Sequence, residues 1–169
     1  NEARRTEIQN LLDLKAYRFL SLTDSLEFRE NYPEYVLPSR FVDRWKPTDE
    51  GGTKAKRRIV ILDFQDPHVL QLERGAPTPT KEAFTTVLQA LASQRRHAWS
   101  SDIKNAFGQA AKTTRKQPIA ASLPAGMIEA GCKDVDPRQL LLCETEVYGL
   151  ISGPSWLRQS LVKDFEAWG

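Results

Sequence analysis

One hexapeptide of the chain, Asp102 to Phe107, combines residue types that suit a site for a hard cation. Its sequence is Asp-Ile-Lys-Asn-Ala-Phe, and Asp102 lies near the end of a segment, His97 to Ile103, that is predicted to be a strand. A carboxylate at an exposed strand end offers oxygen ligands to Mg²⁺, and the phosphates of a ligand complete the octahedron. The simpler alternative is that Asp102 caps the next helix, and the spacing alone favours it.

Two clusters of basic residues are candidates to clamp a triphosphate or a nucleic-acid backbone, because their charges neutralise phosphate oxygens. The first lies beside a glycine-rich turn and comprises Lys54, Lys56, Arg57 and Arg58. The second follows the hexapeptide and comprises Lys112, Arg115 and Lys116. Runs of charge are usually solvated surface, so that alternative stays open for both clusters.

The segment from Tyr148 to Pro154 carries Gly149 and Gly153 at the start of a predicted helix. Free backbone N–H groups and the helix dipole attract phosphates to such an end. Glycine and proline are also ordinary residues at helix starts, so this segment alone is a weak indication.

The composition excludes several other classes of protein. The chain has 24 Lys+Arg and 22 Asp+Glu, a net charge of +2, so any basic surface must be local. The two cysteines, Cys132 and Cys143, are too few and too ill-spaced for a zinc site or a disulfide framework, and the two histidines add no metal cluster. Neither a Gly-x-Ser-x-Gly motif nor a P-loop occurs. No apolar run approaches the ~18 residues that a membrane span needs, so we expect no membrane contact and a reduced, intracellular environment.

These residues must be positioned by a chain of 169 residues, which suits about one domain of ~100–200 residues. Ile8 and Leu11 have helical spacing in an opening helix that is predicted to end near Tyr17. The next stretch, Ser21 to Pro38, is polar and broken by prolines, which predicts irregular structure.

A β-hairpin is predicted around the turn from Thr48 to Gly52. The run from Arg40 to Lys46 forms its first strand, and the run from Lys54 to Leu62 forms its second. Continuous β-branched residues at Ile59 to Leu62 predict that the second strand is buried on both faces.

The remaining segments complete an α+β pattern. Thr78 is predicted to cap an amphipathic helix that has Pro79 at its first position. The strand at 97–103 is followed by strands predicted at 117–123 and 139–143, and by a final helix that starts near Ser152.

The order of these motifs resembles the reverse-transcriptase domain of copia-type LTR retrotransposons, over about residues 36–165. The matching features, in chain order, are Lys56 to Val60 with a closing Phe64, a Pro-Thr break and helix at 76–91, Asp-hydrophobic-Lys-x-Ala-Phe at 102–107, and Tyr-Gly-Leu-x-x-x-Pro at 148–154 before Trp156. The resemblance implies an α+β right-hand polymerase fold with a mixed or antiparallel sheet and packed helices. Residues 1–33 would be an N-terminal helical lead-in, and residues 34–169 the fingers and the start of the palm.

By this resemblance Asp102 ligates the catalytic Mg²⁺ ions with help from the Ile103 carbonyl, and Phe107 excludes a ribose 2′-hydroxyl. The other implied roles are nucleotide binding by Lys56, Arg57, Arg58, Tyr148 and Gly149, and nucleic-acid binding by Lys54, Lys112, Arg115 and Lys116. The implied partners are an RNA or DNA template with its primer, dNTPs, and the rest of a polyprotein with palm, thumb and RNase H regions. The implied location is a cytoplasmic particle or the nucleus.

One departure from the family concerns its second metal-binding motif. Family members place two adjacent aspartates downstream of the last helix, and this sequence contains no such pair. One carboxylate cannot clamp two Mg²⁺ ions, so we expect a partial reverse-transcriptase domain that does not extend a primer by itself. The alternatives are a decayed or domesticated remnant that binds nucleic acid or a partner without catalysis, and a plain α+β domain with solvated basic clusters.

Overall fold

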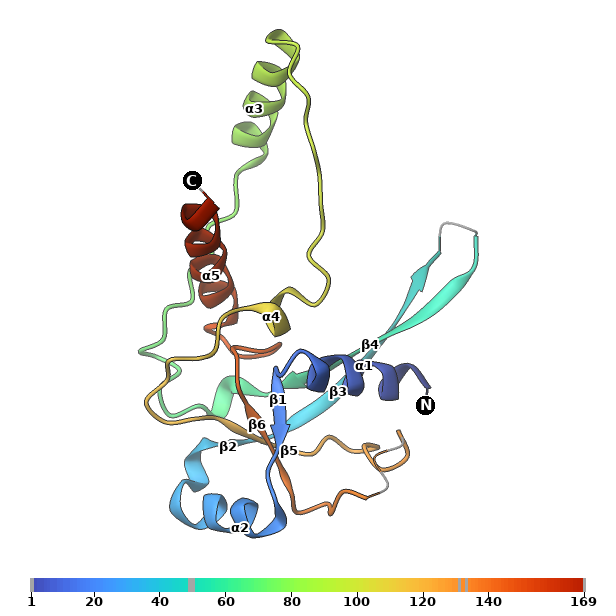
Figure 1. Ribbon diagram of the computed structural model, residues 1–169, viewed down its shortest axis with the longest axis vertical. Coiled ribbons are helices and arrows are strands. Elements are labelled where there is room, and N and C mark those ends of the chain that lie inside the picture. The colour runs from blue at the N-terminus through green and yellow to red at the C-terminus, as the bar shows by residue number, and fades with distance from the viewer. Residues whose placement is uncertain (1, 49–50, 131, 133, 169) are drawn as a thin grey trace.

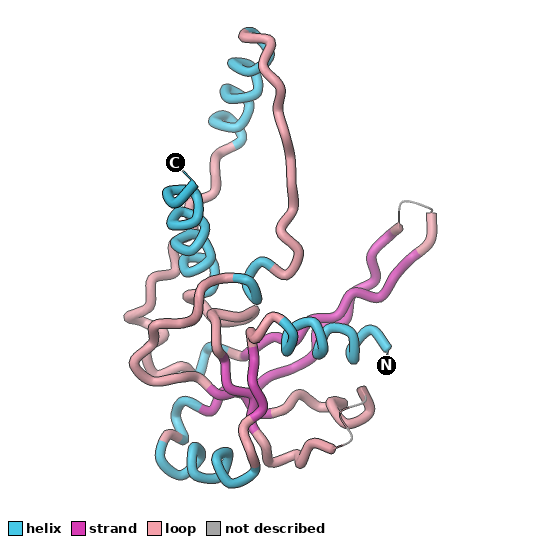
Figure 2. Tube along the Cα trace, viewed as in Figure 1, coloured by secondary structure: helices cyan, strands magenta, loops and turns pink. Residues whose placement is uncertain are grey.

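The computed structural model describes residues 2–48, 51–130, 132 and 134–168, which form a mixed α+β fold (Figures 1 and 2). The main sheet has the strand order β1-β6-β5-β2. These strands are β1 (Tyr17–Phe19), β6 (Leu140–Cys143), β5 (Ala120–Ser122) and β2 (Val36–Leu37). β6 is antiparallel to both neighbours and β2 is parallel to β5, so the sheet is mixed. The predicted α+β class is confirmed, as are the predicted strands that contain β5 and β6.

The helix α1 (Glu2–Asp13) packs its apolar side into the core, as predicted. Ile8 and Leu11 belong to one buried cluster with Ile59 and Leu141. Residues on both sides of the predicted division after residue 33 therefore share this core.

α1 ends earlier than the sequence predicts. Lys15 adopts a positive φ of 55°, which breaks the helical path, and Tyr17 already begins β1. The chain therefore turns within three residues from the helix into the edge strand of the main sheet.

Residues 21–38 are regular, so the predicted irregular structure is wrong. The helix α2 (Leu22–Asn31) begins after Ser21, whose hydroxyl accepts a hydrogen bond from the Asp24 N–H at 3.1 Å. A short 3₁₀ turn, η1 (Pro33–Tyr35), then leads into β2. The cap at Ser21 was the available sequence signal, because the polar composition of α2 hides its periodicity.

The predicted hairpin is confirmed as β3 (Ser39–Pro47) and β4 (Thr53–Ile61), which project from the body (Figure 1). At the turn, the Thr48 N–H donates a hydrogen bond to the Gly52 carbonyl at 2.8 Å, while residues 49–50 lie outside the described residues. The prediction that the second strand is buried on both faces is wrong. Only Ile59 and Ile61 of β4 are buried, since the rest of the strand extends beyond the core.

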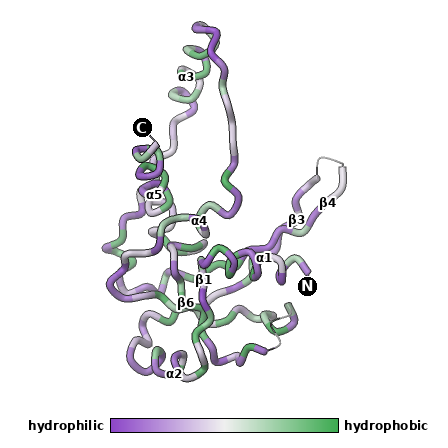
Figure 3. Tube along the Cα trace, viewed as in Figure 1, coloured by the Kyte–Doolittle hydropathy of each residue, from purple (hydrophilic) through white to green (hydrophobic). Residues whose placement is uncertain are grey.

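The helix α3 (Lys81–Ser93) also projects from the body (Figures 1 and 3). It begins two residues later than predicted, because Thr80 rather than Thr78 accepts the capping hydrogen bond from the Ala83 N–H. Phe84 and Val87 are each 57% exposed, so its apolar side contributes little to the core. The segment 63–80 connects β4 to α3 and includes the 3₁₀ turn η2 (Asp63–Gln65). Between residues 81 and 105, all of which the structure describes, α3 is the only helix.

The strand predicted at His97 to Ile103 is wrong. This segment has no regular structure and runs from α3 back to the body (Figure 2), and Trp99 in it is 95% exposed. Strand formation depends on hydrogen bonds and packing with a neighbouring strand, which this segment lacks among the described residues.

The final helix α5 (Gly153–Trp168) starts where the sequence predicts. Leu157 and Leu161 are half-buried, whereas Phe165 and Trp168 are exposed. Within the described ranges, no helix combines the length and apolar character needed to cross a membrane.

Candidate functional site

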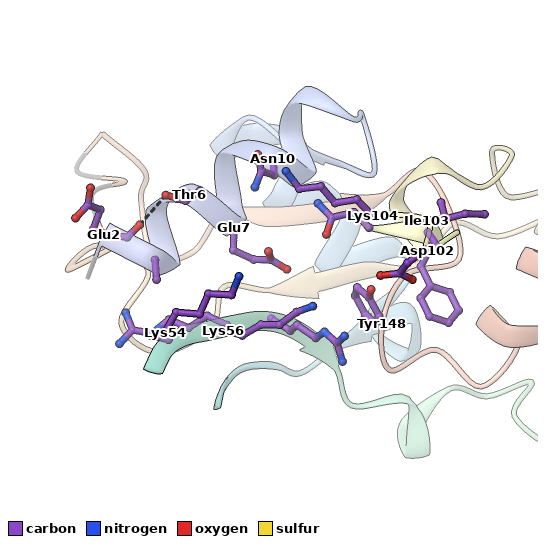
Figure 4. A pocket seen from close by; sticks show the side chains of 17 residues that line it. Glu2, Thr6, Glu7, Asn10, Lys54, Lys56, Asp102, Ile103, Lys104 and Tyr148 are labelled. Atoms are coloured by element: carbon purple, nitrogen blue, oxygen red, sulfur yellow. Dashed lines mark hydrogen bonds between the residues drawn. The ribbon is translucent and has the colours of Figure 1, made fainter. Parts of the chain in front are cut away.

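A pocket of about 820 Å³ brings together residues that lie far apart in the chain (Figure 4). Its walls come from α1, β4, the loop before α4 (Ala106–Gln109) and the segment after β6. The candidate residues that line it are Lys54, Lys56, Arg57, Arg58, Asp102, Ile103, Phe107 and Tyr148. The fold therefore places the first basic cluster, the hexapeptide and Tyr148 around one space.

The register of the hairpin gathers basic side chains on one of its faces. Directly opposed residues of an antiparallel pair point to the same side, and Lys56 opposes Arg44 while Arg58 opposes Val42. The resulting basic face holds six cations and no carboxylate: Arg40, Arg44, Lys46, Lys54, Lys56 and Arg58. A second hollow of about 520 Å³ lies over this face and reaches Tyr148 and Gly149. Lys56 and Arg58 border both hollows.

Arg57 lies on the opposite face of the hairpin, where its charge already has a partner. Its Nε lies 3.2 Å from the Asp43 Oδ1. Asp43 also accepts a hydrogen bond from Arg4 of α1 at 2.9 Å, which is the main reason that the pKa of Asp43 is lowered. Arg57 borders the pocket, but its pairing with Asp43 leaves it less available than Lys56 and Arg58 for the triphosphate contact predicted for all three.

Aromatic contacts join Arg58 to the hexapeptide. The Arg58 guanidinium carbon lies 4.7 Å from the centroid of the Tyr148 ring, a cation–π contact. The Tyr148 and Phe107 centroids are also 4.7 Å apart in an edge-to-face arrangement. Burial raises the pKa of Tyr148 against the opposing effect of Arg58, so its hydroxyl is protonated at neutral pH. Phe107 is half-buried and therefore presents part of its ring to the pocket.

Gly149 holds the segment after β6 close to β4. Its φ is +99°, and the carbonyl of the preceding Tyr148 accepts a hydrogen bond from the Ile61 N–H at 2.9 Å. A Cβ at Gly149 would overlap the Ile61 backbone. Gly149 borders the hollow over the basic face rather than the larger pocket.

Asp102 and Ile103 lie in an exposed loop before α4 instead of at a strand end. The alternative that Asp102 caps the next helix is wrong, since Asn105, with a φ of 53°, occupies the N-cap of α4. Figure 4 shows the Asp102 carboxylate beside Tyr148.

The carboxylates that line the pocket, Glu2, Glu7 and Asp102, limit the kind of metal site that it can form. Among the described residues, no three or more His, Cys, Asp or Glu side chains are grouped to hold a metal ion. Mg²⁺ commonly uses one or two carboxylates with water and ligand phosphates, so Asp102 fits one such ion. The two-ion site implied by the family does not fit the carboxylates present here.

The second basic cluster is divided between the surface and the interior. Lys116 is exposed, and Lys112 is exposed with its Nζ 3.5 Å from the Glu144 carboxylate. The Arg115 side chain is only 11% exposed, and its Nε donates to Glu146 at 2.8 Å. The nucleic-acid contact predicted for Arg115 is therefore corrected to a structural role, because buried acceptors already engage its guanidinium.

Arg115 is the centre of a buried ionic cluster that we define as Arg115, Asp66, Glu146 and Asp63. The Arg115 guanidinium donates to Asp66 and Glu146 and also to the Ser152 hydroxyl at 2.8 Å. Burial would raise the pKa of Glu146, but hydrogen bonds, chiefly from Arg115, hold it below its usual value. The cluster ties the start of α5 to the segments around Asp66 and Arg115.

Asp63 gives the stability of the fold a specific pH dependence. Burial raises the pKa of Asp63 to about 6; the hydrogen bond from the Ile151 N–H opposes this rise, and the neighbouring Asp66 adds to it. An unfolded aspartate has a pKa of ~3.9, so the folded chain binds this proton more tightly and the contribution of Asp63 to stability falls as pH rises from about 4 to about 6.

The variant Asp63→Asn should remove this decrease of stability with rising pH and raise the free energy of unfolding at pH 7 by about 1 kcal/mol. The amide keeps an acceptor for Ile151 and gains a donor for Asp66. Urea unfolding at pH 4.5 and pH 7 measures the effect, with the exposed Asp164→Asn as the matched control. If Asp63→Asn loses as much stability between pH 4.5 and pH 7 as the native chain, Asp63 is not the source of this pH dependence.

Sequence reasoning alone misses Arg44, Lys46 and Glu7. Alternate basic residues along β3 are the signal that identifies the first two once the hairpin register is known. Glu7 lines the pocket from α1, and no sequence pattern marks it.

Comparisons with models of protein families, with curated proteins and with solved structures found no match to this chain. The residues and geometry of the pocket are therefore the basis of the functional proposal.

Proposed function

We propose that this chain is part of an RNA-directed DNA polymerase, a partial reverse-transcriptase domain similar to those of copia-type retrotransposons. Its pocket binds the triphosphate of an incoming dNTP, and the basic face of the hairpin binds the phosphates of a template–primer duplex. The remaining palm carboxylates, thumb and RNase H regions would come from other parts of the polyprotein. We place the protein inside the cell, in a cytoplasmic particle or the nucleus.

The observation that carries this proposal is the convergence of three separate motifs on one pocket. Lys56 and Arg58, Asp102, and Tyr148 belong to motifs that the sequence resemblance assigns to one nucleotide site. They come from three separate parts of the chain, yet all line the same 820 Å³ space. A resemblance due to chance gives no reason for this proximity.

Each group has a chemical task that its position allows. Lys56 and Arg58 neutralise the β- and γ-phosphates, and the cation–π contact with Tyr148 limits the orientations of Arg58. The edge of Phe107 beside Tyr148 provides a wall for the sugar. When bound, Mg²⁺ would supply charge neutralisation at the phosphates, and the Asp102 carboxylate with the Ile103 carbonyl would hold it.

The variant Arg58→Ala is expected to weaken binding of dTTP in Mg²⁺ by about tenfold, because a charge-assisted contact to phosphate is lost. Calorimetric titration in the presence of a template–primer duplex measures it. Arg158→Ala removes the same charge from the exposed side of α5 and should change affinity less than twofold. Equal effects of the two variants would refute the proposed pocket.

A second candidate function is nucleic-acid binding without catalysis. The basic face favours it, since six cations without a carboxylate form a surface that needs no metal ion. Asp102→Asn distinguishes the candidates: it abolishes the Mg²⁺-dependent gain in dTTP affinity if the polymerase proposal holds. A domain that only binds nucleic acid shows no such gain in the native chain.

A further inference from the structure

The helix α1 forms one wall of the pocket and is fixed in place by contacts with the core and with the hairpin. Ile8 and Leu11 anchor it in the core. Arg4 anchors it to the hairpin, with its Nη2 2.9 Å from the Asp43 Oδ2 and its guanidinium carbon 4.8 Å from the centroid of the Phe41 ring. The side chains that α1 directs at the pocket are therefore held at a defined position.

α1 contributes two acidic residues to the lining of the pocket, Glu2 and Glu7, and Glu7 is the one whose side chain extends toward β4. It lies three positions after Arg4, on the same side of the helix, and Figure 4 shows its side chain extending from α1 into the space above Lys56. Burial raises the pKa of Glu7, whereas the charges of Arg58 and Lys56 oppose this effect, so both cations act on the carboxylate. Within the described part of the chain, the Glu7 carboxylate has no hydrogen-bond or ion-pair partner.

Glu7 thus adds a negative charge to the proposed phosphate site. It forms no ion pair with Lys56 or Arg58 among the described residues, so both cations can still contact a phosphate. A free polyphosphate that reaches Lys56 and Arg58 lies within range of Glu7 and is repelled by it. A polyphosphate that carries a bound divalent cation has less negative charge and is repelled less.

We propose that Glu7 makes the pocket selective for a polyphosphate complexed with a divalent cation over the free polyanion. This inference rests on the proposed nucleotide-binding function and adds the form of the ligand that the pocket prefers. Glu7 acts through its charge as a specificity-determining residue and is not a metal ligand.

The test uses inorganic tripolyphosphate as the probe and the whole chain as the protein. Its dissociation constant is measured by calorimetry in EDTA and in excess Mg²⁺, at equal ionic strength. Glu7→Gln should tighten binding about fivefold in EDTA and change it less than twofold in Mg²⁺. Asp13→Asn removes one charge at the exposed end of the same helix, outside the pocket, and should leave both constants unchanged. Glu7→Ala is a second variant, which keeps the helix and removes the same charge.

The outcomes separate this inference from the function on which it rests. If Arg58→Ala weakens tripolyphosphate binding but neither Glu7 variant tightens it in EDTA, the inference is wrong and the pocket remains the phosphate site. If Glu7→Gln weakens binding in Mg²⁺ instead, Glu7 ligates the metal and the inference is wrong for that reason. If Arg58→Ala has no effect on tripolyphosphate, the proposed function and the inference both fail.

Discussion

Replacing Arg115 with methionine is expected to lower the free energy of unfolding by about 3–5 kcal/mol. The substitution keeps most of the side-chain volume but removes the only cation of the buried ionic cluster. Asp66 and Glu146 have side chains that are 0% and 4% exposed, so neither carboxylate can recover its hydration. The loss is large because two buried charges are left without their partner.

Urea unfolding at pH 7 measures this prediction, and Lys116→Met is its matched control. Lys116 is the next residue, is exposed, and belongs to the same basic cluster in the sequence. We expect its substitution to change stability by less than about 0.5 kcal/mol. A similar small effect in both variants would show that the buried ionic cluster does not stabilise the fold and would reopen a surface role for Arg115.

Arg115 also shows why part of the site could not be predicted from the sequence. Its partners lie 49 and 31 residues away, at Asp66 and Glu146. Local charge spacing makes Lys112, Arg115 and Lys116 look alike, whereas burial separates them. Only the tertiary contacts of Arg115 reveal that its charge is already neutralised.

The elements that were predicted well are those whose signals are local. The hairpin follows from two extended runs around paired glycines, and α5 follows from Gly153 and Pro154 before an apolar periodicity. The strand at 97–103 fails because strand formation depends on a neighbour that the sequence does not specify. α2 was missed because its polar residues carry little periodicity, although Ser21 is an effective cap.

The sequence contains recognisable signals for the motifs of the candidate pocket, but not for the different positions of neighbouring residues within them. Lys56 and Arg57 are adjacent in the sequence, but strand alternation puts them on opposite faces of β4, and Arg57 is the one of the two that pairs with Asp43. The contribution of α1 required the fold, since nothing near Glu7 resembles a phosphate-binding pattern. The pocket is thus a product of long-range packing as much as of its motifs.

Gly149→Ala is expected to lower the free energy of unfolding by about 3 kcal/mol and to weaken dTTP binding in the same preparation. Two separate costs add at this position. A φ of +99° is strained for any residue with a Cβ, and that Cβ would overlap the Ile61 carbonyl and approach the Ile61 nitrogen to 2.7 Å. Relief requires the segment to move away from β4, which breaks the hydrogen bond between Ile61 and Tyr148.

Gly51→Ala isolates the first cost, that of the positive φ, because Gly51 has a φ of +81° but no atom within 4 Å of an added Cβ. It should cost only about 1 kcal/mol, the penalty of the left-handed backbone alone. The difference between the two variants in urea unfolding is then the energy of the close approach between the segment after β6 and β4. If Gly149→Ala costs no more than Gly51→Ala, that approach is not tight. Tyr148 would then not be fixed against Arg58 by the backbone, and the aromatic wall of the pocket would depend on side-chain packing alone.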